Sequence, residues 1–180
     1  MDRLAPKPVS ASKSELTEQV LPGEANPLGY LLGGRVMHLM DIACAMAALR
    51  HCRRPVVTVS VDKLDFRHPV KIGHFIILKS SVNFTGKTSM EVGVKVESED
   101  PLTGERWHTS SAYFTFVALN QFGKPTPIPA VVPQTPEEKR RFAEGKARYE
   151  ARRAERELRT AARGTGGSGE LPPRGKRRGR

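Results

Sequence analysis

The chain has 180 residues, of which 38% are hydrophobic, and a formal net charge of +11. This length fits one domain, and the apolar content supplies one core. No apolar run approaches the roughly 18 residues of a membrane-spanning helix. The stretch from Met1 to Val20 mixes charged residues and prolines, whereas a secretory signal has a continuous apolar segment. We therefore expect a cytoplasmic protein without a membrane span.

The positive charge is distributed unevenly. Residues 134–180 contain 15 Lys and Arg against 7 Glu, a net of +8, while residues 1–133 contain 15 basic and 12 acidic residues, a net of +3. A basic C-terminal segment has affinity for nucleic-acid phosphates, so a nucleic-acid-binding protein is an alternative function. Aromatic residues for base stacking are scarce there, with only Phe142 and Tyr149. The body of the protein is close to neutral.

The elements begin with residues 1–22, which we expect to be a flexible N-terminal arm. A turn-rich segment, Glu24 to Gly34, follows. From Arg35 to His51 the alanines and methionines favour a helix. Its apolar residues occupy nearly every face, so this helix is predicted to be buried. Cys44 and Cys52 belong to this stretch or follow it directly, as small buried thiols commonly do.

After Pro55 the pattern changes to the period of two that is typical of strands. Strands are predicted at residues 57–61, 75–84, 89–98 and 106–120, with a further piece around Leu64–Phe66. A long helix followed by an antiparallel meander indicates an α+β fold. The helix and the sheet can bury each other if the sheet curls around the helix, which is the hotdog architecture.

Four prolines between residues 125 and 133 indicate an extended exit from this domain, which we place at residues 23–133. Residues 134–162 are predicted to form a charged helix, with Thr135 as its N-cap before Glu137 and Glu138. Residues 163–180 have the composition of a disordered basic tail.

Asp41 is the most informative single residue. Between Arg35 and Arg50 the only other ionisable side chain, cysteine aside, is His38. An unpaired carboxylate in an apolar helix is expensive, so a compensating interaction is expected. Two interpretations remain open, a structural carboxylate that is capped or ion-paired, and a base or nucleophile held in a cleft.

Gly33 and Gly34 should open this helix, where free backbone amides stabilise negative charge such as an oxyanion. The two glycines could equally be a simple turn. Asp41 follows Gly34 by seven residues, about two turns or 10 Å along the axis, too far for one carbonyl group to touch both. Two antiparallel helices in a symmetric dimer would place each Asp41 against the other subunit's Gly34.

Asn26 is a second candidate, held in a turn by Pro27. Asparagine before proline is usually only a turn former. Its amide could also polarise a carbonyl group or hold a water molecule.

Five segments of the chain together resemble a known family: NPLGYLLGGRVMHLMD, RHC, VVTVSVDKLDF, GKTSMEVGVKV and SAYFTFVALNQFGKPTPIP. They are similar to the cytosolic, or brain-type, acyl-CoA hydrolases and to their short bacterial homologues. The likeness runs from about Asn26 to Glu155. It implies a hotdog fold, hydrolysis of fatty acyl-CoA to free acid and CoA, and no metal.

The resemblance also implies an essential asparagine and an essential aspartate supplied by different hotdog units, matched here by Asn26 and Asp41. A single unit carrying both residues predicts a homodimer with two sites, and a hexamer built as a trimer of dimers is also open. CoA would be part of the substrate and product, with no separate cofactor. The absence of a CxxC pair and of an HExxH cluster agrees with the lack of a metal site.

The phosphates of CoA need donors at the mouth of the cleft. Lys87, Thr88 and Ser89 follow Gly86 in a turn that offers an ammonium group, two hydroxyls and backbone amides. The same turn could be an ordinary hairpin. Arg54, beside Arg53, is a weaker candidate and could be a solvated charge at the helix end.

Two further functions belong to other classes. A hotdog hydratase or dehydratase needs a catalytic histidine paired with a carboxylate. His38 precedes Asp41 by three residues, but the chain has no Asp-x-Asn-Pro-x-x-His pattern. An inactive acyl-CoA sensor is less attractive because both Asn26 and Asp41 are present.

Overall fold

The computed structural model describes residues 4–62 and 64–164, with side chains up to residue 160. The chain divides into one compact unit of residues 1–146 and a second of residues 147–180. Most of the predicted basic tail at 163–180 lies outside the described residues. Within the described part, no helix is long and apolar enough to cross a membrane.

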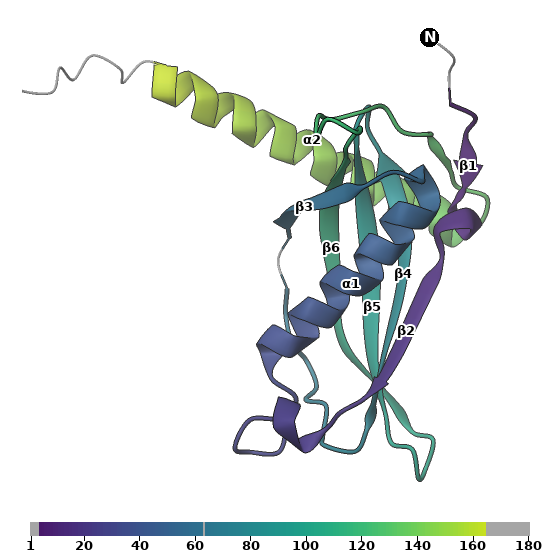
Figure 1. The fold of residues 1–180 in the computed structure, drawn as a ribbon, viewed down its shortest axis with the longest axis vertical. Helices are drawn as coiled ribbons and strands as arrows, with labels where there is room; N and C mark the ends of the chain where they lie inside the picture. The colour runs from purple at the N-terminus through teal and green to yellow at the C-terminus, as the bar shows by residue number, and fades with distance from the viewer. Residues whose placement is uncertain (1–3, 63, 165–180) are drawn as a thin grey trace, which may run out of the picture. The chain divides into compact units, whose positions relative to one another are not determined.

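Helix α1 (Gly33–Cys52) and a five-stranded antiparallel sheet form the first unit (Figure 1). The order in the sheet is β2-β4-β5-β6-β3. The strands are β2 (Ser14–Gln19), β3 (Val56–Val61), β4 (Phe75–Thr85), β5 (Ser89–Glu99) and β6 (Arg106–Ala118). The sheet curls around α1, so the predicted α+β hotdog architecture is confirmed, as are the helix and the four long strand predictions.

The N-terminal segment differs from the expectation of a flexible arm. β2 pairs with β4 from Ser14↔Ser80 to Gln19↔Phe75. Upstream, β1 (Lys7–Pro8) pairs in parallel with β7 (Val131–Val132), and a 3-10 turn covers Val9–Ser12. The prediction of an arm at 1–22 is therefore wrong for its described part. It failed because β2 lies at the edge of the sheet and exposes much of its polar sequence, which leaves little of the alternating apolar pattern of a strand.

The segment around Leu64–Phe66 is not a strand. Its described residues are irregular, and Phe66 is about half exposed. Arg67 donates its backbone N–H to the carbonyl oxygen of Thr109 at 2.8 Å, and Ser110 Oγ donates to the carbonyl oxygen of Asp65 at 2.9 Å, isolated contacts rather than a ladder. Of the apolar residues that suggested a strand, Leu64 packs against the core and Phe66 lines a pocket beside the start of α1.

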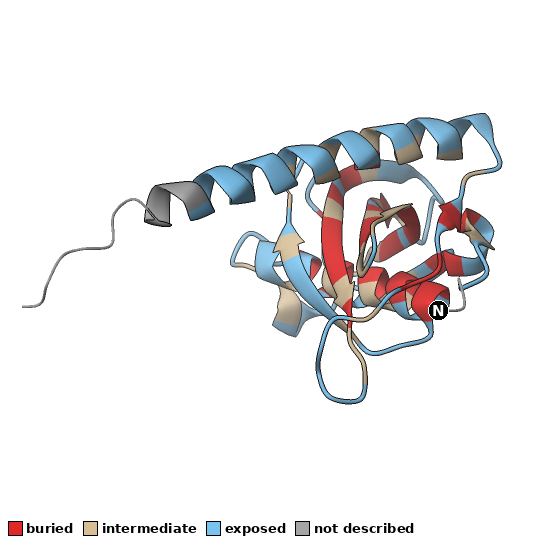
Figure 2. Cartoon of the chain, turned by 90° about the horizontal axis from the view of Figure 1, so that it is seen from above, coloured by how far each residue is buried: buried red, intermediate tan, exposed pale blue. Residues whose placement is uncertain are grey.

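The core lies between α1 and the concave face of the sheet (Figure 2). On β5, alternate side chains face α1 and are buried, namely Met90, Val92, Val94 and Val96. The intervening Glu91, Gly93 and Lys95 therefore belong to the opposite, convex face. One side of α1 is buried in the same core.

The sheet does not cover the rest of α1. The following apolar side chains of α1 and of the edge strand β3 are at least a third exposed: Met37, Ile42, Leu49, Val57, Val59 and Val61. We call these residues the outer apolar face. The expectation of a buried helix is therefore not met within one chain, because the five-stranded sheet packs against a single side of α1.

Helix α2 (Pro136–Gly164) begins where the sequence predicts. Glu138 donates its N–H to Thr135 Oγ1 at 3.2 Å and accepts from the N–H of Thr135 through its carboxylate at 3.2 Å, a capping box. The first turns of α2 lie on the convex face, where the Phe142 ring contacts the Phe84 ring edge-on at 5.3 Å. A Cβ atom on Gly145 would stand 2.9 Å from the Glu91 carboxylate, so glycine permits this close packing.

Candidate active site

Asn26 is fixed in a tight turn before α1. Its Oδ1 accepts hydrogen bonds from the N–H groups of Leu28 at 3.0 Å and Tyr30 at 3.2 Å. Its backbone N–H donates to the carbonyl oxygen of Tyr30 at 2.8 Å. Its Nδ2 has no hydrogen-bond partner among the described residues. The side-chain oxygen therefore builds the turn, while the amide N–H groups remain available as donors.

The start of α1 presents free amides beside this turn. Leu32 is the N-cap residue and provides no side-chain cap. Arg35 and Val36 both donate to the carbonyl oxygen of Leu32, at 2.9 and 3.1 Å, but the N–H groups of Gly33 and Gly34 find no acceptor in the described part of the chain. Such unpaired N–H groups carry the positive end of the helix dipole.

Glycine keeps this helix start accessible. A Cβ on Gly33 would lie 3.6 Å from the Phe66 ring, and one on Gly34 would meet nothing within 4 Å. Both glycines are exposed. An incoming group can therefore approach the two amides closely from outside the chain.

Asn26 and Gly33 line the same pocket, of about 320 Å³. The other residues that line it are Tyr30, Leu31, Val36, Phe66, Arg67, His68, Pro69, Val70 and Thr109. The Thr109 hydroxyl is buried and has no hydrogen-bond partner among the described residues. Sequence reasoning missed Thr109, since a threonine within a strand carries no signal of its own. No carboxylate lines this pocket.

Asp41 lies elsewhere on α1, about two turns beyond Gly34. It is half-buried rather than fully buried. Its Oδ1 accepts a 2.6 Å hydrogen bond from Thr58 Oγ1 on the edge strand β3. Thr58 was also missed. The only available signal was its polar position among the valines of that strand. One chain alone therefore does not bring Asp41 and Asn26 together.

The thiol next to Asp41 is not a competing nucleophile. Burial raises the pKa of Cys44 well above its usual value, and the Asp41 carboxylate raises it further. Burial also raises the pKa of Cys52. Both cysteines are free and buried, as the sequence predicted. Their thiols stay protonated near neutral pH, so neither is activated as a nucleophile.

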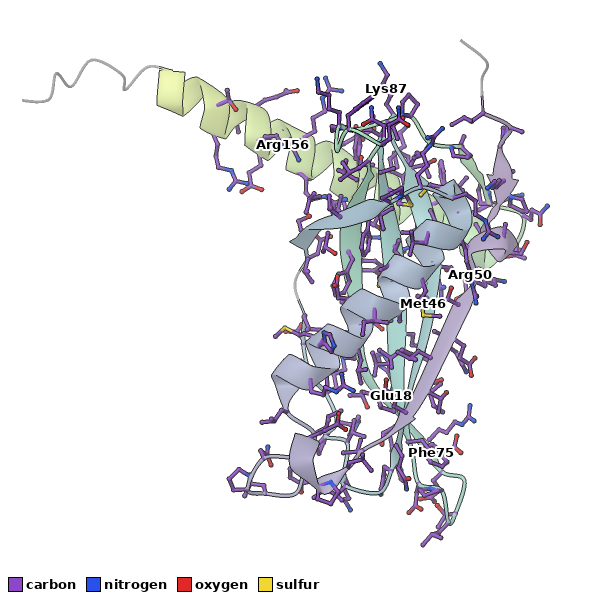
Figure 3. The ribbon with its side chains drawn as sticks, in the orientation of Figure 1. Glu18, Met46, Arg50, Phe75, Lys87 and Arg156 are labelled. Carbon is purple, nitrogen blue, oxygen red and sulfur yellow. The ribbon has the colours of Figure 1, made fainter. Side chains whose placement is uncertain are left out.

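The predicted CoA-binding residues gather at the far end of the sheet. Lys87, Thr88 and Ser89 form the β4–β5 hairpin, which Gly86 closes by donating to Ser89 at 2.8 Å. Arg54 lies two residues before β3, near the same end, and Figure 3 places Lys87 at the opposite end of the sheet from Phe75. The length of α1, about 30 Å, separates this end from Gly33. Within one chain these residues cannot serve the Asn26 pocket.

The described residues contain no group of three or more His, Cys, Asp or Glu side chains that could hold a metal ion. The chemical groups at hand are thus backbone amides, the Asn26 amide, two threonine hydroxyls and one carboxylate, Asp41, held by Thr58. Such a set can polarise a carbonyl oxygen and can activate water or attack a carbonyl carbon.

Known proteins are similar in sequence to most of this chain. Residues 28–105 match the Thioesterase superfamily. The cytosolic acyl coenzyme A thioester hydrolase of Rattus norvegicus is 41% identical over 84% of this chain, but this chain spans only 40% of that protein's length. The uncharacterized acyl-CoA thioester hydrolase YkhA of Bacillus subtilis is 44% identical over 71% of this chain and 74% of its own length.

Solved structures of acyl-CoA thioesterases and hydrolases are also similar to this chain. A hexameric acyl-CoA thioesterase is 41% identical, with a TM-score of 0.81, over 84% of this chain and 97% of its own. The acyl-CoA hydrolase of Staphylococcus aureus, solved with butyryl coenzyme A and coenzyme A, is 33% identical, with a TM-score of 0.79, over 87% of this chain and 95% of its own. The chain therefore belongs to the acyl-CoA thioester hydrolases of the thioesterase superfamily.

Proposed function

We propose that this protein hydrolyses fatty acyl-CoA thioesters in sites shared between two copies of the chain. One observation carries the proposal. The pocket with the Asn26 amide and the free amides of Gly33 and Gly34 contains no carboxylate, whereas Asp41 is held by Thr58 outside that pocket. The pocket supplies hydrogen-bond donors without a carboxylate, and Asp41 supplies the carboxylate.

The open edge of the sheet supports a two-fold pairing. Among the described strands β3 pairs with β6 alone, so its other edge presents backbone groups that a further strand could pair with. The outer apolar face lies on this edge strand and on the neighbouring helix. A second copy would cover both, and a two-fold axis would set the two α1 helices antiparallel. Each Asp41 would then face the partner's helix start.

In this arrangement the thioester oxygen accepts hydrogen bonds from the Gly33 and Gly34 amides and from Asn26 Nδ2. The partner's Asp41 takes a proton from water, whose oxygen attacks the carbonyl carbon, or attacks that carbon itself to give an anhydride that water then cleaves. In both routes the C–S bond breaks, CoA leaves as a thiolate and takes up a proton. Thr58 is a positioning residue, since its hydroxyl fixes one carboxylate oxygen.

The Staphylococcus aureus enzyme supports these assignments. Alanine variants of that enzyme have been solved at an asparagine, at an aspartate 15 residues further on, and at a threonine 17 residues after the aspartate. Asn26, Asp41 and Thr58 have the same two spacings in this chain. The threonine of that series corresponds to Thr58, which joined the candidate site because of its contact with Asp41 in the structure and not because of a sequence pattern.

The same two-fold pairing would also bring the candidate CoA-binding residues close to the shared site. Antiparallel helices carry the far end of one subunit's α1, with Arg54 and the Lys87–Ser89 turn, past the helix start of the other. These residues would then bind the CoA pyrophosphate outside the cleft. Assembly of three dimers into a hexamer and a location in the cytoplasm complete the proposal, supported by the hexameric relative and the cytosolic ones.

The experiment compares two asparagines with the same turn-forming role. Asn120 Oδ1 accepts from the N–H groups of Phe122 and Lys124, the same i+2 and i+4 pattern that Asn26 shows. Asn26→Asp keeps the acceptor oxygens of the turn and removes the donor, so kcat for acyl-CoA hydrolysis should fall at least about 100-fold. Asn120→Asp should leave kcat unchanged. Equal kcat values for both variants would contradict the proposal.

A single turnover in heavy-oxygen water then separates the two chemical routes. Label in the Asp41 carboxylate would show direct attack, because it enters when water cleaves the anhydride at the aspartyl carbonyl. Activation of water would place the label in the fatty acid alone. Acyl-CoA substrates of increasing chain length, assayed in parallel, define the depth of the acyl pocket.

A further inference from the structure

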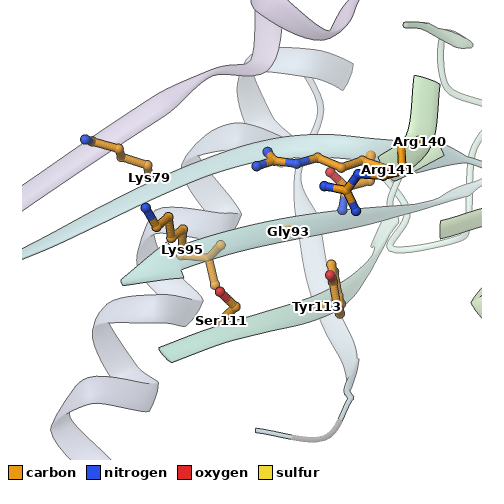
Figure 4. Close-up of a pocket in the computed structure, with 9 residues that line it drawn as sticks. Lys79, Gly93, Lys95, Ser111, Tyr113, Arg140 and Arg141 are labelled. Carbon is orange, nitrogen blue, oxygen red and sulfur yellow. The ribbon is translucent and has the colours of Figure 1, made fainter. Parts of the chain in front are cut away.

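A second pocket lies on the convex face of the sheet, beneath the first turns of α2 (Figure 4). Its volume is about 180 Å³. It is lined by Lys79, Asn83, Gly93, Val94, Lys95, Ser111, Tyr113, Arg140 and Arg141. This lining contains four cations and no acidic side chain. Because β5 turns Gly93 and Lys95 away from α1, the pocket is separated from the Asn26 site by the sheet.

The acidic partners of these cations lie outside the lining. Glu97 is shared by Lys79 at 3.2 Å and Lys95 at 2.6 Å. Arg140 and Arg141 each pair with a glutamate one turn away on α2, Glu144 and Glu137, at 2.7 Å. Exposed pairs of this kind are weak. A dianion in the pocket can therefore compete for cations that converge on it from two strands and one helix.

The floor of the pocket supplies an unused donor. Asn83 is only 3% exposed, and its Nδ2 has no hydrogen-bond partner among the described residues. It packs over Gly93, where a Cβ atom would come within 2.6 Å of that nitrogen. Only glycine at 93 leaves room for the amide. A buried donor without an acceptor is costly, so an acceptor in this pocket would stabilise the protein.

We propose that this pocket binds a phosphate-class anion, either free or as the phosphate group of a larger molecule. Ser111 and Tyr113 on β6 add hydroxyl groups to the four cations and the Asn83 amide. Arginine and lysine together give phosphate oxygens charge-assisted hydrogen bonds. The volume suits a phosphate or pyrophosphate group, and the polar lining does not suit an acyl chain.

Calorimetric titration of the full chain with inorganic pyrophosphate tests the site. The double variant Arg140→Gln and Arg141→Gln removes two cations from an exposed helix surface, so the fold should survive, and Kd should rise at least about tenfold. The matched control is Arg153→Gln with Arg156→Gln, which removes the same charge from the same helix outside the pocket. Its Kd should stay within about twofold of the unchanged chain.

Two results would overturn the proposal: no saturable binding of pyrophosphate by the unchanged chain, or equal weakening in the pocket and control variants, which would mean diffuse charge attraction. Lys95→Gln, on the strand side, should weaken binding as well. Displacement of pyrophosphate by CoA, lost in the Arg140 and Arg141 variant, would identify CoA as a phosphate source, and no displacement would exclude CoA and leave another phosphate-class anion as the ligand. Asp41→Asn should bind pyrophosphate normally, so this site can be tested even if the thioesterase proposal fails.

Discussion

The two α-helices in the described part of the chain differ in the distribution of their apolar and charged residues. α1 has apolar residues on both its inner and outer sides and a single carboxylate, Asp41. α2 is polar over most of its surface and carries ion pairs at i,i+4 spacing, such as Arg153 with Glu157 at 2.9 Å. A helix of the first kind depends on what covers it, whereas one of the second kind is supported by its own turns. Substitutions in α1 should therefore alter assembly and catalysis, and those in the outer part of α2 should not.

The largest effect is expected when the Asp41 carboxylate of α1 is removed, and a glutamate of α2 serves as the control. Asp41→Asn keeps the size of the side chain and removes the base or nucleophile, so kcat for acyl-CoA hydrolysis should fall about 100- to 10,000-fold. Glu157→Gln on α2 should leave kcat unchanged. Steady-state release of free CoA measures both. An Asp41→Asn protein of full activity would remove Asp41 from the mechanism.

Charges placed on exposed apolar residues give the next largest effect. Ile42→Glu, on the outer apolar face, should weaken the dimer by at least about 2 kcal/mol, roughly thirtyfold in Kd, because the carboxylate would be buried without a partner. Leu158→Glu, on a residue of α2 that is also exposed, should not change the oligomeric state. Light scattering after size-exclusion chromatography distinguishes monomers, dimers and hexamers. Unchanged assembly in the Ile42 variant would place the interface elsewhere.

Gly145 belongs to the first turns of α2, which pack against the sheet, so its substitution should not follow helix propensity alone. In an open helix, alanine would be about 1 kcal/mol more favourable than glycine. Here the added Cβ would lie 2.9 Å from Glu91 Oε1 and 3.1 Å from Phe84 Cβ. Gly145→Ala should therefore lower the free energy of unfolding by about 1–2 kcal/mol, measured by urea denaturation. A rise in stability would show that this turn does not pack on the sheet.

The smallest effect concerns His51, buried near the end of α1. Burial lowers its pKa, and Lys7 lowers it further, against the opposing hydrogen bond with the Pro129 carbonyl. The unfolded chain therefore takes up a proton at a higher pH, near about 6.5. Stability should be complete above that pH and should decline as the pH falls from there toward the folded pKa. His51→Gln should flatten this part of the stability curve, whereas an unchanged curve would assign the pH dependence to other groups.

Much of the fold follows from local patterns, because α1 and the long strands have strong periodicity. The exceptions are informative. β2 carries Glu15, Glu18 and Gln19 at a sheet edge, where polar residues are tolerated and the alternation fades. Leu64 and Phe66 look like strand residues, but Leu64 packs against the core and Phe66 lines a pocket. Exposure at an edge and burial around a pocket are tertiary properties that a local pattern does not encode.

The residues of the candidate site also fall into those that the sequence indicates and those that only the fold reveals. Asp41 stands out in the sequence because a carboxylate is unusual in an apolar helix, whereas Asn26 and the two glycines look like ordinary turn residues until the resemblance to a known family is considered. Thr58 and Thr109 do not stand out, since threonine is ordinary in a strand. Their importance arises only when the fold brings Thr58 to 2.6 Å from Asp41 and leaves the Thr109 hydroxyl unpaired in the pocket.

The most direct test of a shared site mixes two inactive chains. Asn26→Asp and Asp41→Asn homodimers should each be inactive, but a mixed dimer would contain one site with both natural residues and one with neither. After unfolding and refolding at equal amounts, about half of the dimers are mixed, so about one quarter of the natural activity should return. No recovery, despite mixed dimers confirmed by mass spectrometry, would show that both residues act within one chain.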